Sequence, residues 1–133
     1  MTAIAYVDAS ALAKFVLDEP ESPALSEALR SQRAAVVTSL LGRVEVERAA
    51  RREGVPDDAV QDVLGDVTLL SLDVAVAAVA GRIAPAGLRA LDAIHLATAH
   101  GLGADLDVMY CYDRRLANAA RAVGIDVRSP GAA

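Results

Sequence analysis

The sequence has few residues of the kinds that stabilise a small fold other than by aliphatic packing. Its 133 residues include one cysteine, one phenylalanine, three tyrosines and no tryptophan. The single cysteine, Cys111, excludes an internal disulfide, and its apolar neighbours indicate a buried, reduced side chain. The core must therefore be built mainly from Ala, Val, Leu and Ile.

Long hydrophobic runs and a basic leader are also absent. No stretch approaches the roughly 18 consecutive apolar residues that a membrane-spanning helix needs. The N-terminus leads directly into the apolar run 3–7, with no basic segment before it, so we expect no signal peptide. These absences favour a cytoplasmic protein.

Positive charge is scarce, and the formal net charge is −5. This balance argues against a generic nucleic-acid binder, which usually presents a basic face. The objection weakens if several acidic residues are collected in one pocket for a metal ion. Almost all of the positive charge is arginine, because Lys14 is the only lysine.

Strand-like and helix-like segments alternate along the chain. Strands are expected at 3–7, 34–37, 67–72 and 108–112, with a short fifth at 125–127. Helices are expected at 11–17, 24–32, 38 to about 53, 57 to about 64, 76–83, 88 or 91 to 100, and 116–123. This order predicts a single α/β domain over 1–133, with a mostly parallel sheet of four to five strands between helices. Residues 129–133 are expected to be a frayed tail.

Acidic residues stand where such a sheet binds its ligands, beyond the carboxyl ends of the strands. Asp8 and Asp113 directly follow the first and fourth predicted strands. Asp92 lies near the start of its helix, and Glu45 lies inside the helix after the second strand. If the first and fourth strands are neighbours, Asp8 and Asp113 meet, and the other two acids can reach the same place.

Clustered carboxylates have a chemical use that offsets their mutual repulsion. Repulsion raises their pKa values, and a hard divalent cation with oxygen ligands relieves it. Such a cation lowers the pKa of water and stabilises charge on a phosphate oxygen. A set of acids without a cysteine or histidine cluster favours Mg²⁺ or Mn²⁺ over structural zinc.

A structural interpretation competes with the metal site. Asp is a favoured N-cap residue, and the three aspartates all lie at plausible helix starts. Glu45 can equally be a surface residue that pairs with Arg48 or Arg52 on the same helix face. Spacing alone leaves both interpretations open.

Five stretches resemble, in order and approximate spacing, the motifs of PIN-domain proteins, in particular the VapC-type toxins of bacterial toxin–antitoxin pairs. They are distributed along nearly the whole chain, and they are Tyr6–Lys14, Thr38–Glu45, Ala90–Ala99, Tyr112–Ala120 and Gly124–Pro130. The resemblance implies a PIN-like three-layer sandwich and a Mg²⁺- or Mn²⁺-dependent endoribonuclease. It also implies a homodimer and inhibition by a cognate VapB-type antitoxin.

The resemblance also assigns roles residue by residue. The acidic quartet of the family matches Asp8, Glu45, Asp92 and Asp113, as catalytic residues and metal ligands. Ser10 matches the small hydroxyl residue beside the first acid. We expect Asp8 and Asp92 to hold the metal most directly, with Glu45 and Asp113 completing the pocket and helping to deprotonate the attacking water.

Several nearby residues have two interpretations each. Ser10 either donates a hydrogen bond to Asp8 or to a phosphate of the substrate, or it only caps a helix. Arg114 and Arg115, next to Asp113, contact phosphate, an antitoxin or only water, and the solvated interpretation is slightly favoured. His95, one helical turn after Asp92, is either a general acid or a packed core histidine, and its apolar neighbours favour the core. Tyr110 and Tyr112 are more typical of strand core than of a base-stacking surface.

Two other functions fit parts of the pattern. A metal-dependent phosphatase also gathers acids at strand ends, but it uses a second aspartate or a Thr/Ser at a fixed offset and usually a lysine near the phosphate. Asp8-Ala-Ser10 supplies no second aspartate, and the only lysine, Lys14, lies in the first predicted helix. A non-catalytic PIN-like module would use the acids only to dock arginine-bearing partners. An inhibitor's arginine can pair with the same carboxylates.

Overall fold

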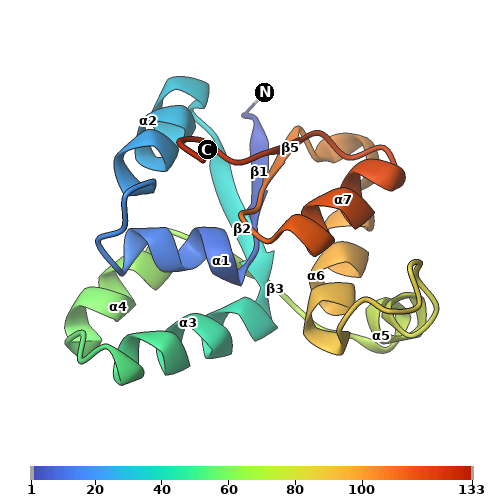
Figure 1. Cartoon of the computed structure of the whole chain (residues 1–133), viewed down its shortest axis with the longest axis horizontal. Helices are drawn as coiled ribbons and strands as arrows, with labels where there is room; N and C mark the ends of the chain where they lie inside the picture. Colours follow the sequence, from blue (N-terminus) through green and yellow to red (C-terminus); the bar gives the residue numbers. More distant parts are fainter. Residues whose placement is uncertain (1, 133) are drawn as a thin grey trace.

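The computed structural model describes residues 2–132, and within them a five-stranded parallel sheet forms the centre of the fold (Figure 1). The strands are β1 (Ile4–Val7), β2 (Ala35–Ser39), β3 (Thr68–Leu70), β4 (Val108–Tyr110) and β5 (Val127–Arg128). Their order across the sheet is β3-β2-β1-β4-β5. The predicted parallel sheet is confirmed, and β1 and β4 are central neighbours as the acidic residues required.

Helices cover both faces of this sheet. They are α1 (Ala9–Leu12), α2 (Ser22–Gln32), α3 (Leu40–Arg52), α4 (Asp57–Gly65), α5 (Val74–Ala80), α6 (Ala90–His100) and α7 (Arg114–Ala122). Two short 3-10 turns, η1 (Ala13–Phe15) and η2 (Gly103–Asp105), complete the helical segments. In Figure 1, α1 to α4 lie on one side of the sheet and α5 to α7 on the other. Among residues 2–132, no helix has both the length and the apolar character needed to cross a bilayer.

Strand β1 explains why the fold has three layers. Side chains of a strand point alternately to its two faces. Ala5 and Val7 pack with residues of α1 to α4, whereas Tyr6 packs with residues of α6 and α7. The continuous apolar sequence of β1 is thus that of a strand buried on both faces.

The strand register brings the ends of β1 and β4 together. Val7 pairs with Tyr110, and the amide of Asp8 donates a hydrogen bond to the carbonyl of Tyr110. At the end of β2, Ser39 caps α3 by accepting a hydrogen bond from the amide of Leu41, as the sequence predicts. Three chain segments therefore turn from strand to helix at one edge of the sheet.

Two segments differ from the sequence-based predictions. A helix was predicted over 76–83 because Val76, Val79, Ala80 and Ile83 share one helix face, but α5 ends before Ile83 and contains no buried residue. It follows β3, an edge strand, and packs mainly on α6, so most of its surface meets solvent.

The C-terminal tail is the second difference. The hydroxyl of Ser129 donates to the carbonyl of Cys111, and the hydroxyl of Tyr112 donates to that of Pro130 at 2.7 Å. These bonds anchor residues 129–132 to the core, where fraying was expected. The remaining residue of the predicted tail, Ala133, lies outside the described residues.

Candidate active site

Asp8 is the first residue after β1, and it is 3% exposed. One carboxylate oxygen accepts a hydrogen bond from the amide of Ala11 at 3.0 Å, which makes Asp8 the N-cap of α1. The other oxygen accepts from the thiol of Cys111 at 3.3 Å. The capping function predicted for this residue is therefore real.

Ser10 fixes the orientation of the Asp8 carboxylate. Its hydroxyl lies 2.7 and 2.8 Å from the two Asp8 oxygens and has one proton to donate to either. The same hydroxyl oxygen accepts from the amide of Tyr112 at 2.9 Å, so it links the ends of β1 and β4. The expected bond from Ser10 to Asp8 is confirmed, whereas the residue that caps the helix is Asp8 itself.

Burial gives Asp8 an unusual electrostatic state. Loss of solvent raises the pKa of its carboxyl, and hydrogen bonds from Ser10 and Ala11 counteract that effect only in part. Burial also raises the pKa of the Cys111 thiol, with further contributions from Asp8. Cys111 is thus a protonated thiol that donates to Asp8, in agreement with the buried, reduced cysteine predicted.

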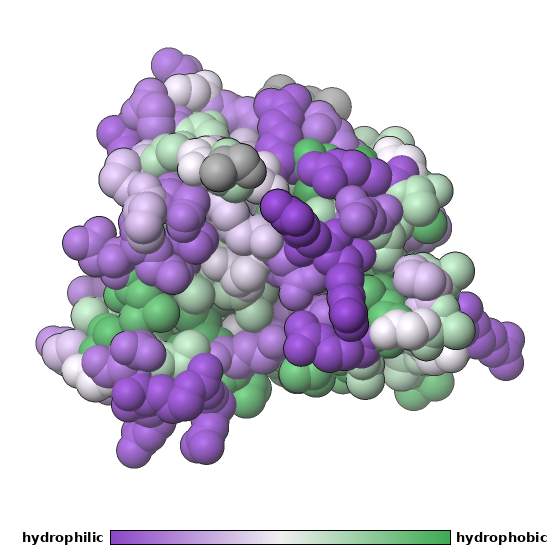
Figure 2. Space-filling model, viewed as in Figure 1, coloured by the Kyte–Doolittle hydropathy of each residue, from purple (hydrophilic) through white to green (hydrophobic). Residues whose placement is uncertain are grey.

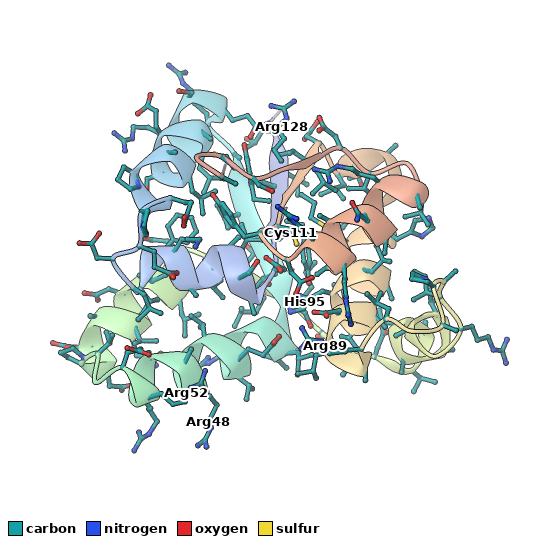
Figure 3. All side chains as sticks on the ribbon, viewed as in Figure 1. Arg48, Arg52, Arg89, His95, Cys111 and Arg128 are labelled. Carbon is teal, nitrogen blue, oxygen red and sulfur yellow. The ribbon has the colours of Figure 1, made fainter. Side chains whose placement is uncertain are left out.

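Arg89 joins two of the predicted site residues. Its Nε lies 3.2 Å from an oxygen of Asp92, and its Nη2 lies 3.4 Å from an oxygen of Asp113. Asp113 is also the N-cap of α7, since its other oxygen accepts from the amides of Arg115 and Leu116. Figure 3 shows Arg89 between the helical layers, at the mouth of the site.

Glu45 faces inward from the second turn of α3. Its Oε1 lies 2.7 Å from Nε2 of His95, whose Nδ1 lies 2.7 Å from the hydroxyl of Tyr6. The alternative that Glu45 pairs with Arg48 or Arg52 is wrong, because both arginines point away from the protein into solvent (Figure 3). His95 is buried and fully hydrogen-bonded, as the core interpretation required.

The four acids suit a hard cation by their chemistry, but they are not assembled around one. Within residues 2–132, no three Asp, Glu, His or Cys side chains form a group ready to hold a metal ion. Arg89 is paired with Asp92 and Asp113, and His95 is hydrogen-bonded to Glu45. Because the donors are all carboxylates, they fit Mg²⁺ or Mn²⁺ once Arg89 withdraws. Their role as metal ligands stays a prediction.

The remaining candidates lie at the rim of the site or in the core. Arg114 and Arg115 are exposed, and within residues 2–132 neither forms a salt bridge, which agrees with the solvated interpretation. Tyr110 is buried and donates to the side chain of Gln32 at 2.7 Å. Tyr112 is partly buried, with the ammonium of Lys14 4.7 Å from the centre of its ring.

Two residues of the site were missed by the sequence analysis. Arg89 gave a signal that was not used, since it precedes Asp92 by three positions, the spacing at which helical side chains meet. Tyr6 gave none, because one tyrosine in a buried strand is ordinary core. Its contact with His95 depends on the packing of α6 against the sheet.

Comparisons with known proteins show which family the chain resembles. The family model of the PIN domain matches residues 5–122. Ribonuclease VapC46 of Mycobacterium tuberculosis is 43% identical over 126 residues, which cover 94% of this chain and 96% of that protein. Ribonuclease VapC47 of the same species is 40% identical over 132 residues, covering 96% and 97%.

Two solved structures are similar in fold. One is VapC20 of Mycobacterium tuberculosis, described as a sarcin-ricin loop cleaving toxin, with a TM-score of 0.73 at 17% identity over 95% of this chain and 99% of that one. The other is a PilT N-terminus domain protein of Sulfolobus solfataricus, with a TM-score of 0.57 at 16% identity over 95% and 86%.

Proposed function

The chain belongs to the PIN domain family, and we propose from this premise that it is an endoribonuclease toxin of the VapC type. The observation that carries the proposal is that Asp8 and Asp113 cap the helices that follow the neighbouring strands β1 and β4, where parallel α/β folds bind ligands, while Arg89 joins Asp113 to Asp92. Relatives named ribonucleases are about as long as this chain, so the proposal concerns the whole protein.

We further propose that catalysis depends on Mg²⁺ or Mn²⁺. Asp8 and Asp92 would hold the ion most directly, and Glu45 and Asp113 would complete the pocket. When bound, the cation would supply Lewis-acid activation of water and neutralisation of phosphate charge. The raised pKa of Asp8 supports this assignment, because a cation offsets the cost of a buried carboxylate charge.

The residues of the chain supply orientation and proton transfer. The Ser10 hydroxyl and the Ala11 amide hold the Asp8 carboxylate in place. Glu45 has one oxygen bonded to His95, and its carboxylate can accept a proton from a water that attacks the phosphodiester. Arg114, exposed beside Asp113, is available for a phosphate of the RNA.

Inhibition by a VapB-type antitoxin is supported by Arg89. The site already binds one guanidinium, which bridges Asp92 and Asp113. An inhibitor that carries an arginine would find the same carboxylates, with the two-pronged geometry that such pairs favour. We propose that a short, arginine-bearing antitoxin segment competes with metal in this way.

The protein is proposed to act in the cytoplasm as a homodimer, as the family resemblance implies. Exposed apolar side chains on or directly before α5, namely Leu72, Val74 and Val79, support self-association, and Figure 2 shows hydrophobic surface on the side where α5 lies. Leu12 and Leu25, apolar residues of α1 and α2, are fully buried and belong to the core. A dimer must therefore use other side chains.

RNA cleavage by purified protein tests the function. Wild type, Asp8→Asn and Asp92→Asn are incubated with total RNA, with and without Mg²⁺ or Mn²⁺. We expect metal-dependent cleavage by wild type and a fall of at least about 100-fold in each variant, because a catalytic metal supplies several kcal/mol. Asp62→Asn, an exposed aspartate on α4, is the control and should cleave normally.

Two other results would select the rival functions. If no form cuts RNA although Mn²⁺ binds, the protein is a docking module rather than a nuclease. If it hydrolyses small phosphomonoesters instead, it is a phosphatase. The structure disfavours the phosphatase, because the only lysine is paired with Glu19 and Glu21 and is not free to bind phosphate.

A further inference from the structure

A chain of hydrogen bonds runs from the central strand to Glu45. The amide of Ser39 donates to the Tyr6 hydroxyl at 3.1 Å, that hydroxyl lies 2.7 Å from Nδ1 of His95, and Nε2 of His95 lies 2.7 Å from Oε1 of Glu45. Tyr6 and His95 are 0% and 1% exposed, whereas the Glu45 side chain is 24% exposed. The chain therefore begins in the core and ends at the site.

The direction of these bonds follows from the donors that each group has. The Tyr6 oxygen already accepts from the Ser39 amide, and its own proton needs an acceptor because the group is buried. Two side chains lie near this hydroxyl: Thr38, whose own hydroxyl donates to the carbonyl of Val7, and His95, whose Nδ1 at 2.7 Å is the acceptor we assign. A neutral imidazole that accepts at Nδ1 carries its proton at Nε2, and this N–H donates to the Glu45 carboxylate.

Packing holds the histidine ring in the position that this bond requires. Tyr6 meets the ring edge-on, with centroids 5.8 Å apart. Helix α3 also comes so close to the ring that a Cβ atom on Gly42 would lie 3.3 Å from Cε1 of His95. With both neighbours fixed, the ring has little room to rotate.

This burial excludes a direct chemical role for His95. Both ring nitrogens have partners inside the protein, and 1% exposure leaves no path to a phosphodiester. A general acid must come within hydrogen-bond reach of the group it protonates. The other role predicted from the sequence, that of a packed core histidine, does not explain the hydrogen bond between His95 and Glu45.

We propose that Tyr6 and His95 are positioning residues for Glu45: the Tyr6 hydroxyl sets the Nε2–H tautomer of His95, which holds Oε1 of Glu45 and leaves Oε2 for the acid pocket. The consequence for cleavage depends on the proposed nuclease function. The tautomer of His95 and its effect on the Glu45 carboxylate do not depend on that function. Both parts can therefore be tested separately.

NMR of the imidazole nitrogens tests the tautomer. The chain has only two histidines, so His100→Gln assigns the spectrum. In metal-free buffer near neutral pH, we expect His95 as the neutral Nε2–H form, and we expect Tyr6→Phe to shift it toward a tautomer mixture. A wild-type His95 that is protonated on Nδ1, or a Tyr6→Phe variant with an unchanged tautomer, would overturn the proposal.

Mn²⁺ affinity, measured by calorimetry, tests the effect on Glu45. We expect His95→Phe to weaken binding by about 10- to 100-fold, the usual cost of losing a residue that orients a metal ligand. Tyr6→Phe should weaken it less, and His95→Gln should restore part of the loss because its amide can donate to Glu45. Equal affinity in wild type and His95→Phe would contradict the proposal.

A matched variant separates positioning from general destabilisation. Tyr110→Phe also removes a buried tyrosine hydroxyl, but that group binds Gln32 and not a site residue. We expect it to lose stability without a change in Mn²⁺ affinity. Failure of every form to cut RNA would refute the nuclease function alone, whereas the tautomer and the affinity would still decide the role of His95.

Discussion

At the scale of single residues, Asp8 combines two functions that the sequence presents as alternatives. It caps α1 through the Ala11 amide, and it lies buried at the end of the central strand as a candidate metal ligand. The cap needs only one of its oxygens. Because the folded protein raises the pKa of this carboxyl through burial, ionised Asp8 lowers the stability of the metal-free protein.

This cost predicts an unusual pH dependence for Asp8→Asn. Since the folded-state pKa is raised, the folded state binds more protons than the unfolded state between the two pKa values, and the free energy of unfolding falls as pH rises through that window. The asparagine variant has no carboxyl at this position, so its free energy of unfolding does not fall in this way. In EDTA, the stability of Asp8→Asn relative to wild type should thus rise from acidic to neutral pH, within the roughly 0.5–3 kcal/mol typical of single substitutions.

Chemical denaturation at several pH values measures this difference. Asp62→Asn serves as the control, since an exposed carboxylate should give a nearly constant difference. At saturating Mn²⁺, wild type should instead be the more stable of the two, because metal binding stabilises only the protein that retains the ligand Asp8. A difference for Asp8→Asn that does not vary with pH would show that burial of the charge is not costly.

The aspartates illustrate what residue-level prediction could achieve here. Their positions after strands pointed to one sheet edge, and the structure has Asp8 and Asp113 there as N-caps of α1 and α7. The sequence did not predict that the acids of the site are paired with Arg89 and His95. The bond from Arg89 to Asp113 joins residues 24 positions apart, and it depends on how α6 and α7 are placed in three dimensions.

At the scale of elements, the approach of α3 to α6 depends on a glycine. A Cβ atom at Gly42 would lie 2.7 Å from Oγ1 of Thr38 and 3.3 Å from the His95 ring. Thr38 cannot easily yield, because its hydroxyl donates to the carbonyl of Val7 in the central strand. The close packing that holds His95 beside Glu45 therefore requires a residue without a side chain.

Gly42→Ala should destabilise the protein by about 1–3 kcal/mol, the usual cost of an overpacked interior, although alanine favours helix. Its free energy of unfolding is compared with that of Gly65→Ala, at the end of α4, where an added methyl group has open space. The Gly65 variant should be as stable as wild type or slightly more so. If Gly42→Ala is equally stable, the contact between the helices is looser than the distances indicate.

The alternation of elements was predictable, and their burial only partly so. Apolar runs gave the parallel sheet because β1 and β4 are covered on both faces. The regular spacing of valines in α5 wrongly indicated a buried face. Periodicity reports that a helix has an apolar side, not that another element covers it, and α5 packs mainly on α6, with little else to cover it.

At the scale of the whole molecule, this uncovered surface is the strongest structural support for a homodimer. The large hydrophobic residues that the structure leaves exposed lie mainly between positions 40 and 91, and they are Leu40, Val44, Leu72, Val74, Val79 and Leu91. Val74 is 87% exposed at the first position of α5. Three of them, Leu72, Val74 and Val79, lie on or directly before α5, and contiguous apolar surface marks association sites more often than isolated apolar residues do.

We expect wild type to sediment at twice the monomer mass and Val74→Glu to sediment as a monomer. A charge at the centre of an apolar contact opposes association, while an acidic side chain in the first turn of a helix should leave the fold intact. Val123→Lys is the matched control, because it places a charge on an exposed valine at the end of α7, outside this segment. It should remain dimeric. A dimer that withstands Val74→Glu but is lost in Val123→Lys would place the interface at the end of α7 instead. A monomeric wild type would remove the dimer from the proposed function without affecting the acid site.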